Sequence, residues 1–85
     1  MKNILANQQD KRIYDYVMND IKNSGKNYST LTNSQIAQAL SLSAFSVRDK
    51  VIRLGKRGYL INLINHYDEN NTFFQRKILR GAKSE

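Results

Sequence analysis

The chain has 85 residues, no cysteine, and 14 basic against 7 acidic side chains, which gives a formal net charge of +7 at pH 7. A chain of this length forms one domain that buries only about 60 to 65% of its unfolded surface, which argues against a deep catalytic cleft. The absence of cysteine excludes disulfide bonds and thiolate chemistry and is compatible with a reducing cytoplasm.

The positive charge is concentrated in two late segments. Residues 44–57 have a net charge of +4, and residues 72–85 have a net charge of +3. Clustered cations suit a polyanion, because each phosphate that they neutralise releases condensed counterions. This distribution favours a nucleic-acid partner, and the simpler alternative is a solubilising surface.

The apolar segments are too short for a membrane or an export signal. Ile4 to Ala6 is shorter than the apolar region of a signal peptide, and no run approaches the roughly 18 apolar residues of a membrane span. We therefore expect a soluble cytoplasmic protein, in a prokaryotic cell or in the cytoplasm of a host, with no membrane partner.

The first predicted helix covers residues 8–24. Its apolar residues recur at spacings of three and four, as in an amphipathic helix. Gly25 follows as the residue that ends the helix, and Lys22 lies in the last turn. Residues 28–31 are β-prone and form either a short strand or an ordered loop. The apolar positions of the helix are Ile13, Tyr14, Val17, Met18 and Ile21.

Two further helices are predicted between Thr32 and Gly58, joined by a three-residue turn. Thr32 and Gln35 match a capping box, which marks the start of the second helix. This helix is expected to extend to Leu40. Ser41 must then adopt the left-handed conformation, at a cost of roughly 1 kcal/mol, or use another type of turn. Ser43 is a plausible N-cap for the third helix, at 44–57, and Gly58 ends it. The buried stripe of this third helix is Val47, Val51 and Leu54.

The remaining sequence predicts a β-hairpin and a short tail. Residues 59–65 and 72–79 are rich in apolar and aromatic side chains, and the polar residues 66–71 between them include turn formers. We expect one domain at residues 1–80 and a frayed tail at residues 81–85.

This order of elements, together with the sequence from Ser43 to Leu60, resembles a winged helix-turn-helix domain. In that family a Ser opens the recognition helix, a Val-Arg pair follows, a Leu comes seven residues after the Val, and a Gly with two apolar residues leads into the wing. The resemblance extends from Gln8 to Arg80. The matching residues are Ser43, Val47, Arg48, Leu54, Gly58, Tyr59 and Leu60.

The resemblance implies a fold that is mainly α with small β, namely three helices plus a two-stranded antiparallel wing. The DNA-binding heads of GntR-type and MarR-type repressors are similar, and so are the winged helices of phage and plasmid replication proteins. Such a domain binds double-stranded DNA. The chain is accordingly expected to act in transcription regulation or as a replication or maintenance accessory of a mobile element.

In a helix-turn-helix protein the N-terminal part of the second helix of the motif meets base edges in the major groove. Arg48 is the main candidate for base recognition, because a guanidinium binds guanine O6 and N7 with two hydrogen bonds; a surface ion pair is the alternative. Asp49 could orient an arginine, accept from cytosine, or be solvated. The predicted DNA-binding residues of this region are Ser43, Phe45, Ser46, Arg48, Asp49, Lys50, Arg53 and Lys56.

Two apolar residues of the recognition helix allow more than one interpretation. Phe45 either packs inward against Leu42 and Ile36 or points outward, where it could touch a thymine methyl group. Ile52 lies off the buried stripe, and we expect it to contact the hairpin.

The hairpin supplies the second group of DNA-binding candidates. Arg76, Lys77 and Arg80 could reach phosphates, and Asn70 and Asn71 at the tip could enter the minor groove. The neighbouring Asp68 and Glu69 oppose close phosphate contact at the tip.

Catalysis, cofactors and a small-molecule effector are not expected. His66 is the only histidine, and no set of residues suggests a metal site or a nucleophile. Aromatic residues that stack on single-stranded nucleic acid are an alternative mode of binding. Another alternative is a winged-helix protein-protein adaptor with an apolar face made of Tyr16, Ile52, Tyr67 and Phe74. We expect a monomer or a weak homodimer.

Overall fold

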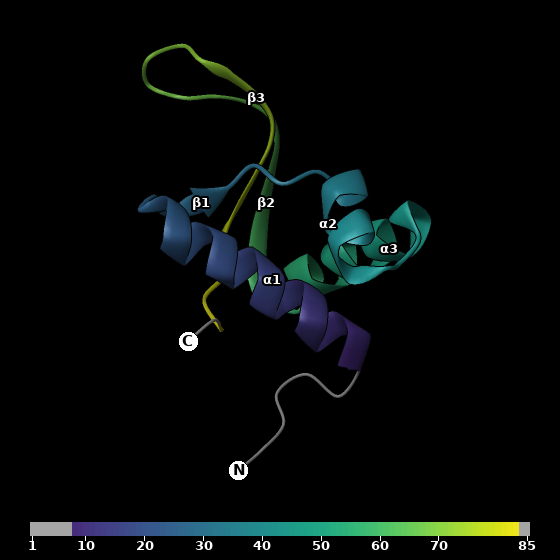
Figure 1. Ribbon diagram of the computed structural model, residues 1–85. Helices are drawn as coiled ribbons and strands as arrows, with labels where there is room; N and C mark the ends of the chain where they lie inside the picture. Colours follow the sequence, from purple (N-terminus) through teal and green to yellow (C-terminus); the bar gives the residue numbers. More distant parts are fainter. Residues whose placement is uncertain (1–7, 84–85) are drawn as a thin grey trace.

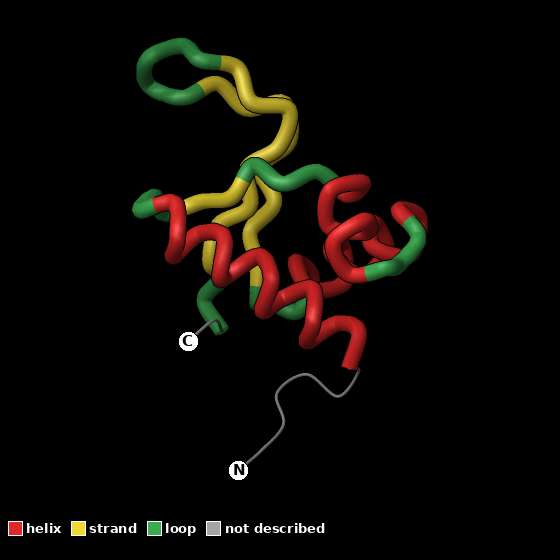
Figure 2. Tube along the Cα trace, viewed as in Figure 1, coloured by secondary structure: helices red, strands yellow, loops and turns green. Residues whose placement is uncertain are grey.

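The computed structural model describes residues 8–83 as three helices and a three-stranded antiparallel sheet. In Figures 1 and 2, α1 crosses in front of the sheet, α2 and α3 lie to one side, and the β2-β3 hairpin extends beyond the helices. The short apolar segment from Ile4 to Ala6 lies outside the described residues. The elements are α1 (Gln8–Ser24), β1 (Tyr28–Ser29), α2 (Asn33–Leu40), α3 (Ala44–Lys56), β2 (Leu60–Tyr67) and β3 (Phe73–Arg80).

The helix boundaries follow the predicted capping residues. The Thr32 side chain accepts from the Gln35 amide at 3.1 Å while the Gln35 side chain accepts from the Thr32 amide at 2.9 Å, which confirms the capping box. Ser43 caps α3 in the same way, with its hydroxyl 3.0 Å from the amide nitrogen of Ser46. Gly25 has a φ of 73°, which suits glycine at the end of α1.

The turn between α2 and α3 uses the left-handed conformation at Ser41, with φ 57° and ψ 45°. The Leu42 amide donates to the Ala37 carbonyl at 2.9 Å, which is the hydrogen bond of a Schellman ending. Arg12 of α1 donates to the Leu40 carbonyl at 3.0 Å and satisfies another carbonyl at this end of α2. The turn therefore fixes the direction in which α3 leaves α2.

The hydrophobic core lies between the three helices and one face of the sheet. Each fully buried Ile or Leu side chain contributes about 1.5 to 3 kcal/mol to folding. The predicted apolar stripes of α1 and α3 both supply core residues. The buried apolar residues are Ile13, Val17, Ile21, Ile36, Ala37, Val47, Val51, Leu54, Leu60 and Ile78.

The sheet differs from the two-stranded element that the sequence predicts. Tyr28 and Ser29 form β1, which pairs with Leu79 and Ile78 of β3, so β3 is the central strand. Ser29 is buried beneath α1. This pairing confirms the short-strand alternative for residues 28–31 and adds a third strand beside β3.

Hydrogen bonding continues past the predicted end of the domain at residue 80. The Gly81 amide donates to the Tyr59 carbonyl and the Lys83 amide donates to the Gly58 carbonyl, both at 2.9 Å. The chain is therefore held against the end of α3 through Lys83, and the last two residues of the predicted tail lie outside the described residues. Between residues 8 and 83, none of the helices combines the length and the apolar character needed to cross a bilayer.

Candidate nucleic-acid interface

The outer face of α3 carries exposed basic and apolar side chains. Val47, Val51 and Leu54 turn the opposite face toward the core. Because residues three and four apart share one side of a helix, the exposed positions form a continuous stripe. The stripe consists of Phe45, Arg48, Asp49, Ile52 and Lys56.

Phe45 points outward, with 68% of its surface exposed. A helix turns about 100° per residue, so Phe45 lies nearly opposite Val47 and cannot share its place in the core. Ile52, which the sequence predicts to contact the hairpin, is 43% exposed on the same outer face. Two large apolar side chains therefore belong to the surface of α3.

Arg48 lies beside Phe45, with its guanidinium carbon 5.6 Å from the centre of the ring. Among residues 8–83 Arg48 makes no ion pair, so the surface ion pair that was the alternative to base recognition is not formed. A cation near an aromatic face at an exposed site gains about 0.5 to 1 kcal/mol, which favours a limited set of Arg48 conformations. The exposed guanidinium keeps its N–H donors available for a partner.

Arg53 has a different environment from the other cations of α3. Its Nε and Nη2 donate to the carboxylate of Asp10 at 3.0, 2.7 and 2.8 Å, and the Asp10 side chain is 1% exposed. These hydrogen bonds, together with the charge of Asp10, raise the pKa of Arg53. These hydrogen bonds direct the guanidinium toward α1. To contact bases in the major groove of DNA, as the sequence predicts, Arg53 would have to give up its ion pair with Asp10.

The sequence does not predict Asp10 as the partner of Arg53. Its only signal is its position as an acidic residue in the first turn of α1, where a carboxylate also interacts favourably with the helix dipole. The other predicted residues of this region are placed without such a partner. Asp49 and Lys56 are exposed, Lys50 is half-buried, and the Ser43 hydroxyl accepts from the backbone amide of Ser46 in the helix cap.

The three predicted cations of the hairpin do not share a surface. Arg76 donates from Nη1 to Asn33 Oδ1 at 2.6 Å and from Nη2 to the Leu31 carbonyl, and burial lowers its pKa. Lys77 places its Nζ 4.1 Å from the centre of the Tyr28 ring and 4.5 Å from that of Phe74. Arg80 is exposed at the base of the hairpin, opposite Leu60.

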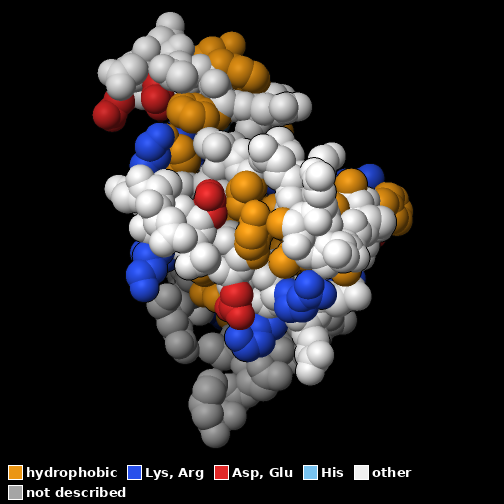
Figure 3. Space-filling view, viewed as in Figure 1, with side chains coloured by type: hydrophobic (Ala, Val, Ile, Leu, Met, Phe, Trp, Pro, Cys, Tyr) orange, Lys and Arg blue, Asp and Glu red, His pale blue; other side chains and the backbone are white. Residues whose placement is uncertain are grey.

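The far end of the hairpin is acidic and apolar. The Asp68 carboxylate accepts from the backbone amides of Asn70 and Thr72 at 2.9 and 2.8 Å and so organises the turn. Asn70 and Asn71 are both exposed there, and Asn71 has a φ of 65°. Figure 3 shows acidic and hydrophobic side chains on this protruding part.

His66 is half-buried in β2, and the described residues contain no cluster of three His, Cys, Asp or Glu side chains that could hold a metal ion.

No protein-family model matches the chain, and no curated protein matches its sequence. Function is therefore inferred from the geometry of α3 and of the hairpin.

Proposed function

We propose that this chain is a winged helix-turn-helix protein that binds double-stranded DNA with α3 in the major groove. The observation that carries the proposal is the outer face of α3, an N-capped helix that follows α2 through a fixed turn and exposes Arg48 and Lys56. In helix-turn-helix complexes the N-terminal residues of the second helix contact base edges.

The proposed contacts follow from the exposure of each side chain. Arg48 recognises guanine, and Phe45 touches a thymine methyl group beside it. Lys50 and Lys56 neutralise phosphates along the groove. Arg53 stabilises the orientation of α3 through Asp10.

The biological role that this activity supports is transcription regulation, or replication and maintenance of a plasmid, phage or other mobile element, in the cytoplasm. The protein works without catalysis or a cofactor. As in part of the winged-helix family, one small domain carries the DNA contacts, and the chain acts as a monomer or a weak homodimer.

Binding to a random-sequence duplex tests the proposal directly. We expect saturable fluorescence anisotropy in about 50 mM salt and a loss of affinity by orders of magnitude in about 200 mM salt. A preferred sequence is then selected from a random pool. Arg48→Ala should weaken binding to that sequence by about 1 to 3 kcal/mol and barely change binding to random duplex.

Lys22→Ala is the matched control, because it removes one exposed cation from α1. It should leave the preference for the selected duplex unchanged. Equal losses for Arg48→Ala on both duplexes would make Arg48 a phosphate contact, and no saturable binding at low salt would refute the proposed function.

A second candidate function is a protein-protein adaptor. It is favoured by the exposure of Phe45 and Ile52, at 68% and 43%, on one face of α3. Of the other predicted docking residues, Tyr67 is 60% exposed, while Tyr16 and Phe74 are partly buried. An adaptor should show no saturable DNA binding, so the anisotropy measurement separates the two functions.

A further inference from the structure

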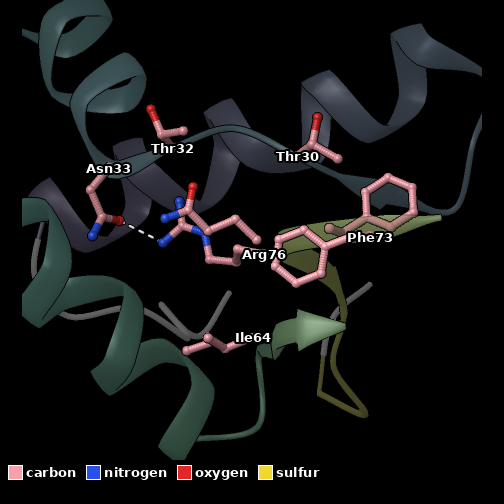
Figure 4. A pocket seen from close by; sticks show the side chains of 8 residues that line it. Thr30, Thr32, Asn33, Ile64, Phe73 and Arg76 are labelled. Carbon is pink, nitrogen blue, oxygen red and sulfur yellow. Dashed lines mark hydrogen bonds between the residues drawn. The ribbon is translucent and has the colours of Figure 1, made fainter. Parts of the chain in front are cut away.

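A pocket of about 400 Å³ lies between the hairpin and the segment that leads into α2 (Figure 4). Its volume falls within the range of about 300 to 1,000 Å³ that is typical of small-molecule sites, and its surface is mainly apolar. The pocket is separate from the outer face of α3. Its lining residues are Thr30, Thr32, Asn33, Ile64, Phe73, Phe74, Gln75 and Arg76.

Arg76 is the only charged residue among those that line the pocket. Two of the five N–H groups of its guanidinium donate to Asn33 Oδ1 and to the Leu31 carbonyl, and both acceptors are uncharged. Among residues 8–83 no ion pair includes Arg76. Burial lowers its pKa, so the cation has lost part of its hydration without gaining an anion.

Two of the apolar side chains that line the pocket are exposed. Ile64 is 67% exposed and Phe73 is 51% exposed, and both line the pocket beside the Arg76 side chain. Large apolar surfaces that remain in water favour a partner that covers them. The pocket therefore combines one partly dehydrated guanidinium with an aromatic and an aliphatic wall.

We propose that this pocket binds an apolar carboxylate, with the carboxylate on the free N–H groups of Arg76 and an aromatic or aliphatic body between Ile64 and Phe73. A carboxylate matches the planar fork of a guanidinium and balances its single charge. A phosphate dianion fits less well, because Arg76 is the single cation of the lining and the walls are apolar. This site is independent of the proposed DNA contacts.

Titration of the full chain with phenylacetate, followed by amide chemical shifts, tests the site. We expect saturable shifts at residues of the pocket, including Thr30, Ile64 and Gln75. Phenylacetamide has the same shape without the charge, and it should bind about tenfold more weakly because it loses the charge-assisted hydrogen bonds. Equal binding of the two compounds would overturn the proposal.

Phe73→Ala removes an apolar wall at a half-exposed position, so the fold should persist while phenylacetate binds about tenfold more weakly. Phe45→Ala is the matched control, because Phe45 is also an exposed phenylalanine beside an arginine but lies on α3. If Phe45→Ala weakens binding and Phe73→Ala does not, the carboxylate binds at α3 and the pocket assignment is wrong.

Arg76→Gln should also weaken phenylacetate binding, provided that its amide spectrum remains that of the folded chain. If Arg76→Gln does not fold, Phe73→Ala tests the site in its place. An apolar group next to a carboxylate occurs in small metabolites and also in protein segments that have an aromatic residue beside an aspartate. The acetylated and amidated phenylalanyl-aspartate dipeptide represents the second source. Tighter binding of the dipeptide than of phenylacetate supports a protein segment, tighter binding of phenylacetate supports a metabolite, and binding of neither refutes the site.

Discussion

Three arginines connect elements that are distant in the sequence. Arg12 reaches the end of α2, Arg53 pairs with Asp10 of α1, and Arg76 bonds to Asn33 at the start of α2. Each guanidinium can satisfy several acceptors at once, which suits it to joining backbone ends and carboxylates. A part of the basic composition therefore stabilises the fold, and a count of charges overestimates the cations that can meet DNA.

The Asp10–Arg53 pair gives the first prediction. Arg53→Ala removes the Arg53 guanidinium from the Asp10 carboxylate, which is 1% exposed, and breaking a pair that includes a buried charge is destabilising. The midpoint of urea unfolding should fall further than for Lys56→Ala, which removes an exposed cation of the same helix. Asp10→Ala should cost less than Arg53→Ala, because the Arg53 side chain is 42% exposed and can reach water. Unchanged stability of Arg53→Ala with reduced DNA affinity would instead assign Arg53 to the groove.

Gly81 gives a second prediction at the scale of a residue. A Cβ atom at Gly81 would lie 2.2 Å from the Gly58 carbonyl oxygen and 2.7 Å from the Tyr59 carbonyl carbon, both of which are backbone atoms. Gly81→Ala should therefore destabilise the fold by about 1 to 3 kcal/mol or more in urea unfolding. Gly25→Ala is the control, since a Cβ there meets nothing within 4 Å and only the φ of 73° is unfavourable, at about 1 kcal/mol. Equal effects of the two changes would show that the close contact at Gly81 relaxes.

At the scale of elements, the sequence predicts helices well because their signals are local. The spacing of Ile13, Val17 and Ile21 and the caps at Thr32 and Ser43 each involve residues within one or two turns. The structure confirms that α1 ends at Ser24 and confirms both caps. The antiparallel pairing of residues 60–67 with 73–80 also matches the predicted hairpin.

The features that the sequence does not predict depend on long-range contacts. Arg53 and Asp10 are 43 residues apart, and so are Arg76 and Asn33. No periodic pattern links such positions, and the direction of Phe45 depends on how α3 is rotated against the core. Sequence reasoning therefore identified the basic face of α3 but not which of its cations is engaged in the fold.

The capping box at the start of α2 gives the third prediction. Thr32→Ala removes the acceptor for the Gln35 amide and should destabilise the fold by about 0.5 to 2 kcal/mol in urea unfolding. Ser34→Ala, an exposed change in the first turn of the same helix, should have little effect. A Thr32→Ala variant as stable as Ser34→Ala would mean that water replaces the cap.

At the scale of the whole molecule, the cations of α3 and those of the hairpin, the two predicted DNA-binding elements, have different surroundings. The cations of α3 outside the Asp10 pair are exposed or half-buried, whereas Lys77 lies over aromatic rings and the hairpin tip carries Asp68 and Glu69. Phosphates should therefore meet α3 more closely than the hairpin. This difference can be measured, because the dependence of affinity on salt counts phosphate contacts.

The double replacement of Lys50 and Lys56 by Ala should reduce the log-log salt slope by about 1.8, since each phosphate contact contributes about 0.9. The matched replacement of Lys77 and Arg80 removes the same charge from the hairpin and should reduce the slope by less than about 0.9, because Lys77 is held over Tyr28 and Phe74. Anisotropy titrations on random duplex at several salt concentrations give both slopes, and circular dichroism checks that both variants are folded. A larger change for the hairpin variant than for the α3 variant would place the DNA backbone along β3, and α3 would then contact a different partner through Phe45 and Ile52.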